Sequence, residues 1–122
     1  MPEVISNTTP ILSLLRINKL HLLRELYTTV TIPLAVFKEI ENGRKKAFYK
    51  DLSKFNWIII KKIKNSASID RFIELDDGEA EVLILANELH ADLVLMDELI
   101  RLRNTIISQY QDIPRKQTFK CV

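Results

Sequence analysis

Short apolar runs alternate with helix-like segments along most of this chain, and this alternation constrains the fold more than any other feature. The runs are Val4–Ser6, Thr28–Ile32, Trp57–Ile63 and Ala91–Met96. The last two contain continuous apolar residues, which is typical of strands buried on both faces. Such strands, separated by helices, favour a mainly parallel sheet with helices on both sides. We therefore predict an α/β fold with three α/β/α layers.

The segments between these runs carry helix signals at their ends. Thr8 or Thr9 can cap a helix whose first turn contains Pro10, since proline needs no hydrogen-bond partner there. The stretch PLAVFKEIEN starts at Pro33, and Gly43 is suited to end it. The other predicted helices cover residues 20–26, 45–55 and 76–90, and a last one starts at residue 97.

Length and composition place the chain among ordinary globular proteins. Its 122 residues, 47% hydrophobic and 28% charged, predict one domain spanning 1–122. The apolar runs are too short to cross a bilayer, and the start lacks the pattern of a secretory signal. The single Cys121 excludes a disulfide within the chain. We therefore expect a cytoplasmic protein without membrane attachment.

Charge is distributed unevenly along the chain. Between Lys38 and Lys64 lie nine of the 18 Lys and Arg residues and three acids, whereas ten of the 16 acids lie between Asp70 and Glu98. The first segment can attract phosphate, and the second can hold a cation. The alternative is a pair of solvated surfaces that balance one another.

Several polar side chains fall where parallel sheets bind ligands, at the carboxyl ends of strands. Asn7 follows the first predicted strand, and Asp97 follows the last. Helical periodicity places Glu79 on a stripe with apolar residues, so it is a better inward candidate than Glu81. For Glu39 and Glu41, which flank opposite sides of an apolar arc, periodicity does not decide. Converging carboxylates repel unless a cation neutralises them, and oxygen-rich clusters select Mg²⁺ or Mn²⁺.

Two long stretches carry a resemblance to a known family. VISNTTPILSLLRINKLHLLRELYTTVTIPLAVFKEI and LDDGEAEVLILANELHADLVLMDE resemble the PIN-domain family, over roughly residues 3–100. The branch most similar contains uncharacterised prokaryotic proteins related to the toxins of VapBC-type toxin–antitoxin pairs. The resemblance implies an α/β/α fold that cleaves RNA, with acidic residues holding one or two Mg²⁺ or Mn²⁺ ions.

The resemblance also implies particular site residues. The first acid of the family falls on Asn7, with Thr8 as its hydroxyl-bearing neighbour. The other acids fall on Glu39, Glu79 and Asp97. Glu81 is a close competitor of Glu79 for the third position. Glu39, Glu79 and Asp97 would then be catalytic and bind the metal, with Asn7 completing the ligand set. In the basic segment, the residues expected to contact the RNA backbone are Arg44, Lys45, Lys46, Lys61 and Lys62.

The chain departs from the family pattern at two places. Residues 101–122 have no glycine and end in polar and basic residues, so we expect the family's C-terminal strand and helix to be missing or altered by truncation or a shifted reading frame. An absent edge strand would favour a homodimer or an obligate partner such as an antitoxin. Asn7 offers a neutral oxygen in place of an anion, which predicts weaker metal binding. The main hypothesis is a toxin ribonuclease, and the alternative is a degenerate, non-catalytic module that binds RNA or a protein.

Overall fold

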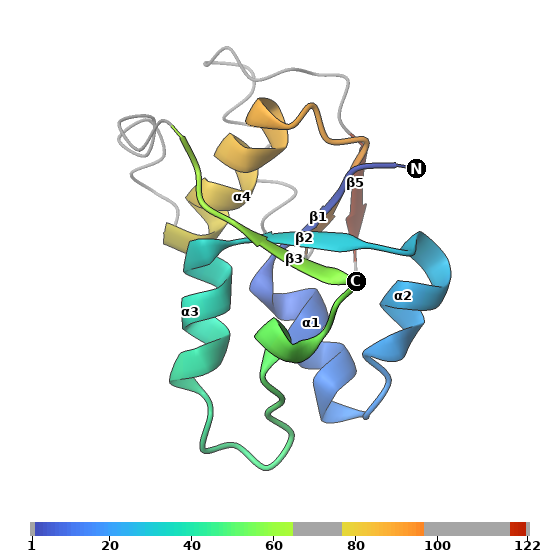
Figure 1. The fold of residues 1–122 in the computed structure, drawn as a ribbon, viewed down its shortest axis with the longest axis vertical. Coiled ribbons are helices and arrows are strands. Elements are labelled where there is room, and N and C mark those ends of the chain that lie inside the picture. Colours follow the sequence, from blue (N-terminus) through green and yellow to red (C-terminus); the bar gives the residue numbers. More distant parts are fainter. Residues whose placement is uncertain (1, 65–76, 97–117, 122) are drawn as a thin grey trace.

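The computed structural model describes residues 2–64, 77–96 and 118–121, with backbone alone for the last range. One five-stranded sheet runs through the molecule (Figure 1), and every neighbouring pair of strands is parallel. In sequence order the strands are β1 (Val4–Ser6), β2 (Val30–Pro33), β3 (Ile58–Lys61), β4 (Leu93–Met96) and β5 (Thr118–Cys121). Their spatial order is β3-β2-β1-β4-β5, so β1 is central.

Helices connect these strands and cover the sheet. The helices are α1 (Thr8–Arg16), α2 (His21–Tyr27), α3 (Leu34–Asn42) and α4 (Asp77–Glu88), with one 3₁₀ turn, η1 (Leu52–Lys54). Figure 1 shows α4 on one side of the sheet and α1 and α2 on the other. Helix α3 starts directly after β2 and contacts both α1 and α4. The predicted α/β class with a parallel sheet between helices is therefore confirmed.

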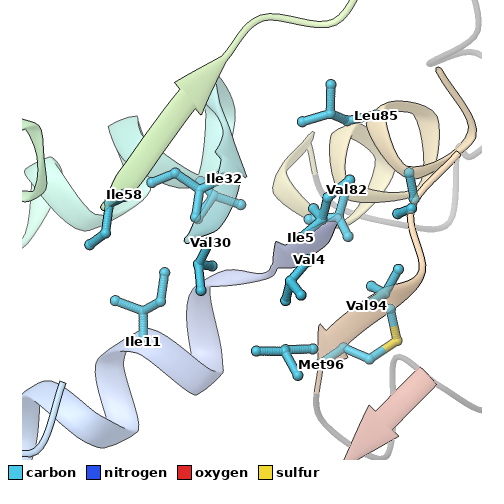
Figure 2. Close-up of a cluster of buried hydrophobic side chains, with 14 of the residues drawn as sticks. Val4, Ile5, Ile11, Val30, Ile32, Ile58, Val82, Leu85, Val94 and Met96 are labelled. Atoms are coloured by element: carbon cyan, nitrogen blue, oxygen red, sulfur yellow. The ribbon is translucent and has the colours of Figure 1, made fainter. Parts of the chain in front are cut away.

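The core lies where the two central strands meet the helices. Ile5 and Val94, which are register partners on β1 and β4, are fully buried. Burial on both faces explains why these strands lack the polar alternation of a half-exposed sheet. Figure 2 shows the central part of this core, to which Val82 and Leu85 come from α4 and Ile11 comes from α1.

The predicted basic helix over residues 45–55 is wrong. Turns follow Gly43, and only η1 is helical in this stretch. Asp51 accepts hydrogen bonds from the backbone N–H and the hydroxyl of Ser53, at 3.0 and 2.7 Å. These bonds lower the pKa of Asp51 and cap η1. Local side-chain bonds of this kind compete with a continuous helix, which the residue pattern alone does not reveal.

The C-terminal segment forms a strand that the sequence did not predict. Residues Thr118–Cys121 pair in parallel with β4, from Leu93 opposite Thr118 to Met96 opposite Cys121. A strand is thus present at this edge of the sheet, where a missing strand was one of the two expected possibilities. Strand β4 is paired on both sides, so an unpaired β4 edge no longer provides a reason for dimerisation. The helix predicted to start at residue 97 lies outside the described residues.

Helices α1 and α4 end in the same backbone motif. After α4, the N–H of Ala91 bonds to the carbonyl of Ala86 and the N–H of His90 to that of Asn87, which defines a Schellman motif. The motif requires a left-handed residue at its turn, and His90 has φ 51°. After α1, Asn18 has the same role with φ 56°. Asparagine tolerates this conformation better than histidine does.

Replacing His90 by glycine should stabilise the protein. His90 is exposed, so the substitution removes the left-handed strain without opening the core. We expect His90→Gly to raise the free energy of unfolding by about 0.5–1 kcal/mol, measured by urea denaturation. Asn18→Gly should give a smaller gain, because asparagine is less strained there and the variant also loses the bond from Lys50. A lower stability for His90→Gly would contradict the assigned turn.

Candidate functional site

The carboxyl edge of the sheet gathers the starts of three helices. Helix α1 begins after β1 and α3 begins after β2, while α4 returns towards β4 and therefore starts at the same edge. The backbone N–H of Asn7 donates to the carbonyl of Leu95 at 2.9 Å, which fixes the end of β1 against the end of β4. Helix N-termini favour negative charge, so this edge suits carboxylates and phosphates.

Asn7 is the least expected side chain at this edge. It is 3% exposed and occupies the N-cap position of α1, yet its side chain makes no capping hydrogen bond. We find no hydrogen bond from its amide to any other residue in the described part of the chain. A buried polar group without a partner costs about 1–3 kcal/mol, so it calls for an explanation.

Thr8 and Glu39 form the direct side-chain link at this site. Thr8 is 6% exposed, and its hydroxyl donates to Oε2 of Glu39 in a short hydrogen bond. This bond joins the first turn of α1 to the middle of α3. It fixes one oxygen of the Glu39 carboxylate, and Oε1 accepts no hydrogen bond from the described residues.

Glu41 has a different environment from Glu39. Its carboxylate accepts a hydrogen bond from the Tyr49 hydroxyl, on the loop that follows α3. This bond raises the pKa of Tyr49 to about 12, with burial and the Glu41 charge adding to the effect. The structure therefore separates two glutamates that helical periodicity could not distinguish. Glu39 faces the edge residues, whereas Glu41 holds the loop.

Glu79 and Glu81 are also separated. Glu79, in the first turn of α4, is 8% exposed. Glu81 accepts a hydrogen bond from the backbone N–H of Ala35 at 3.2 Å. Because Pro33 precedes α3 and cannot cap it through its side chain, Glu81 satisfies one of the free N–H groups at that helix start. Glu81 is thus occupied by α3, and Glu79 is the buried carboxylate.

These donors fit a hard divalent cation by their chemistry. Asn7, Glu39 and Glu79 offer amide and carboxylate oxygens, the ligands that Mg²⁺ and Mn²⁺ prefer. In the part of the chain that the structure describes, no three Asp, Glu, His or Cys side chains group closely enough for a metal ion. Of the acids expected to bind the metal, Glu39 and Glu79 lie in the described part of the chain, whereas Asp97 lies outside it. The Asn7 amide has no hydrogen-bond partner among the described residues, and its carbonyl oxygen would gain a partner by binding such a cation.

The basic residues expected to contact RNA fall into two groups. Lys61 ends β3 opposite Pro33, so Lys61 and the exposed Lys62 lie near the start of α3. The exposed residues Arg44, Lys45 and Lys46 follow the other end of α3. The nine residues of α3 separate the two groups by about 14 Å. The carboxyl edge lies beside the first group.

Sequence reasoning missed the side chains that hold the loop after α3. Tyr49 bonds to Glu41, the Arg16 guanidinium lies 5.4 Å from the centre of the Phe48 ring, and Lys50 donates to the Asn18 side chain at 3.0 Å. The sequence signal for these contacts is the mixture of aromatic and basic residues in RKKAFYK.

Comparison with known proteins identifies a family for nearly all of this chain. A family model described as the PIN domain matches residues 3–105. The match includes the four positions where family acids are expected: Asn7, Glu39, Glu79 and Asp97. No curated protein and no solved structure matches at a significant level. Among the described helices, none has the length and apolar character required to cross a membrane.

The bond between Tyr49 and Glu41 predicts a pH dependence. Because the pKa of Tyr49 is raised in the folded protein, its bond to Glu41 stabilises the fold fully at pH values below the ordinary tyrosine pKa near 10. This stabilisation is lost as pH rises towards about 12. Comparison with Tyr49→Phe identifies the part of the phenolate absorbance that belongs to Tyr49. In a rapid pH jump, we expect this part to appear near pH 12. In Glu41→Gln the same signal should appear nearer pH 10. An unchanged midpoint in Glu41→Gln would contradict the bond.

Proposed function

This chain belongs to the PIN-domain family, and from that premise we propose that it is a metal-dependent endoribonuclease. The observation that best supports the proposal is the buried amide of Asn7, which has no hydrogen-bond partner among the described residues and lies beside the Thr8–Glu39 bond. A fold that only needed a helix start would use Asn7 as a cap. Here the amide bonds to no side chain or backbone group in the described part of the chain, and it lies at the edge where parallel sheets bind ligands.

The proposed ligands are Glu39, Glu79 and Asp97, with the Asn7 carbonyl oxygen completing the set. Bound Mg²⁺ or Mn²⁺ would supply an activated water and stabilise the charge that builds up on the phosphate. Thr8 positions Glu39 by donating to one of its oxygens. Lys61 and Lys62 are suited to bind the RNA backbone through charge, without reading sequence.

The biological setting remains a proposal from the family resemblance. We propose a cytoplasmic toxin of a type II toxin–antitoxin pair, with an antitoxin as protein partner. The exposed apolar side chains of Leu22 and Leu26, one turn apart on α2, support a protein partner. Leu26 is 70% exposed, and this apolar surface is what a protein partner would bury. The homodimer proposal has the same support.

Asn7 also supports a second candidate, a degenerate PIN module that binds RNA or a protein without cutting. A neutral amide contributes less than a carboxylate to the binding of a dication. The two candidates differ in one property, because the nuclease requires a divalent cation at this edge and the degenerate module does not.

Removing the Glu39 carboxylate should abolish metal-dependent cleavage. We expect Glu39→Gln to lower the rate of single-stranded RNA cleavage in Mn²⁺ by at least about 100-fold, because a ligand is lost. Thr8→Val should lower it by about tenfold, since the ligand remains but is no longer oriented. Cleavage is measured with an end-labelled RNA, and EDTA should stop it.

Glu25→Gln is the matched control for this series. Glu25 is an exposed glutamate on α2, away from the carboxyl edge, and its replacement changes the net charge equally. It should leave the cleavage rate unchanged. Cleavage that survives both EDTA and Glu39→Gln would reject the metal-dependent mechanism.

Restoring a carboxylate at residue 7 should strengthen metal binding. We expect Asn7→Asp to raise Mn²⁺ affinity by about tenfold, equivalent to about 1.4 kcal/mol, measured by isothermal titration calorimetry. Without metal the variant should unfold at lower temperature, because a buried charge lacks a partner, and Mn²⁺ should reverse that loss. Asn42→Asp makes the same charge change at an exposed position and should do neither. A folded Asn7→Asp protein that binds no Mn²⁺ would favour the degenerate module.

A further inference from the structure

Four exposed cations gather where the end of α1 meets the loop that follows α3. They form what we call the cationic cluster: Arg16, Lys19, Lys46 and Lys50. Arg16 and Lys46 line the same small cavity between α1, α3 and this loop. The Lys50 ammonium donates at 3.0 Å to the side chain of Asn18, the residue that precedes Lys19. The cluster therefore forms one surface from two segments that are far apart in the sequence.

Contacts within the protein hold this surface in place. The Arg16 guanidinium lies 5.4 Å from the centre of the Phe48 ring, in a cation–π contact that orients it. Tyr49, which follows Phe48, bonds through its hydroxyl to Glu41 and so fixes the loop to α3. A ligand at the cluster therefore loses less free energy in ordering side chains than it would at isolated surface lysines.

No ion pair within the described part of the chain neutralises the cationic cluster. The acids on either side of the loop, Glu41 and Asp51, accept hydrogen bonds from uncharged hydroxyl groups instead. Glu39 lines the cavity that Arg16 and Lys46 share, but the hydrogen bond printed on its carboxylate comes from Thr8. Like charges held close together repel one another, so an anion with several charges would stabilise this arrangement.

Helix α3 places the cluster on the far side of the candidate metal site from the other basic group. Lys61 and Lys62 lie near the start of α3, Glu39 lies on the helix itself, and the cluster adjoins the loop after its end. This loop starts at Gly43, four residues after Glu39 and so about 6 Å further along the helix axis. One strand of a duplex advances about 3.4 Å per nucleotide, so this distance corresponds to about two nucleotides.

From these features we infer that the cationic cluster binds the RNA backbone at phosphates about two or more nucleotides from the phosphate that is cut. The inference rests on the proposed nuclease function for the position of the cut, whereas the binding itself needs no cleavage. An RNA strand carries a series of phosphates, and Arg16 can bind one of them through two N–H groups. An acidic protein segment is the other polyanion that suits such a surface, but the cavity shared with Glu39 favours the nuclease substrate.

The salt dependence of binding tests the inference without cleavage. The probe is a labelled uridine decamer, and fluorescence anisotropy in EDTA measures its affinity for the whole chain between about 50 and 200 mM KCl. Each phosphate contact to a single strand contributes about 0.7 to the slope of log affinity against log salt. We therefore expect Arg16→Gln and Lys46→Gln each to reduce the slope by about 0.7, and the double variant to reduce it by about 1.4.

Matched variants separate a phosphate contact from a general change of charge or structure. Arg24→Gln on α2 and Lys64→Gln beside the end of α4 remove the same charges at other exposed positions, and should leave the slope unchanged. Arg16→Lys keeps the positive charge and should retain the slope as well.

A second measurement tests the position of the contact relative to the cut. In Mn²⁺, Arg16→Gln and Lys46→Gln should each slow cleavage of the decamer at low substrate by at least about threefold, because a phosphate contact is lost. Cleavage of the dinucleotide UpU should be unchanged, because this substrate does not extend to the cluster. An equal effect on both substrates would overturn the assigned position.

The outcomes distinguish this inference from the proposed nuclease function. Unchanged slopes in Arg16→Gln and Lys46→Gln would overturn the inference, and would leave the cluster to an acidic protein partner. An equal loss of slope in the matched controls would also overturn it, because the effect would then follow from net charge alone. A reduced slope in the cluster variants, without any cleavage in Mn²⁺, would support the RNA contact while rejecting the nuclease.

Discussion

The all-parallel pairing of β1 with β2 and β4 is the constraint on which the rest of the structure depends. Because these strands run in one direction, the segments that follow them meet at one edge, and the helices that connect them start there. Asn7 and the start of α3 are neighbours for this reason, despite their separation in sequence. Any register shift between β1 and β4 would break the bond from Asn7 N–H to Leu95 and move the candidate site apart.

Helix α3 gives three glutamates three separate environments around this edge. Its free N-terminal N–H group at Ala35 binds Glu81 of α4, its middle carries Glu39 towards Thr8, and its end carries Glu41 towards Tyr49. Two of these carboxylates are occupied by structural bonds. Glu39 accepts a bond from Thr8 through one oxygen, and the same residue borders a cavity of about 100 Å³.

The sequence predicted the architecture well because strong patterns determine it, whereas the loops depend on individual contacts. Short apolar runs identified β1 to β4, and signals at the helix ends identified α1 and α3. The stretch 45–55 was mistaken for a helix because the bonds from Ser53 to Asp51 leave no periodic pattern. Strand β5 was missed because its composition differs from a buried strand. Periodicity favoured Glu79 correctly as the buried acid, but only the fold separates Glu39 from Glu41.

The central claim is that the side chains at this edge hold a divalent cation, and anomalous diffraction from crystals soaked in Mn²⁺ tests it most directly. The account predicts an anomalous peak about 2 Å from an oxygen of Glu39 and an oxygen of Glu79, with the Asn7 carbonyl oxygen directed at the same ion. Soaked crystals that show Mn²⁺ only elsewhere, with Asn7 bonded to other protein groups, would contradict the account.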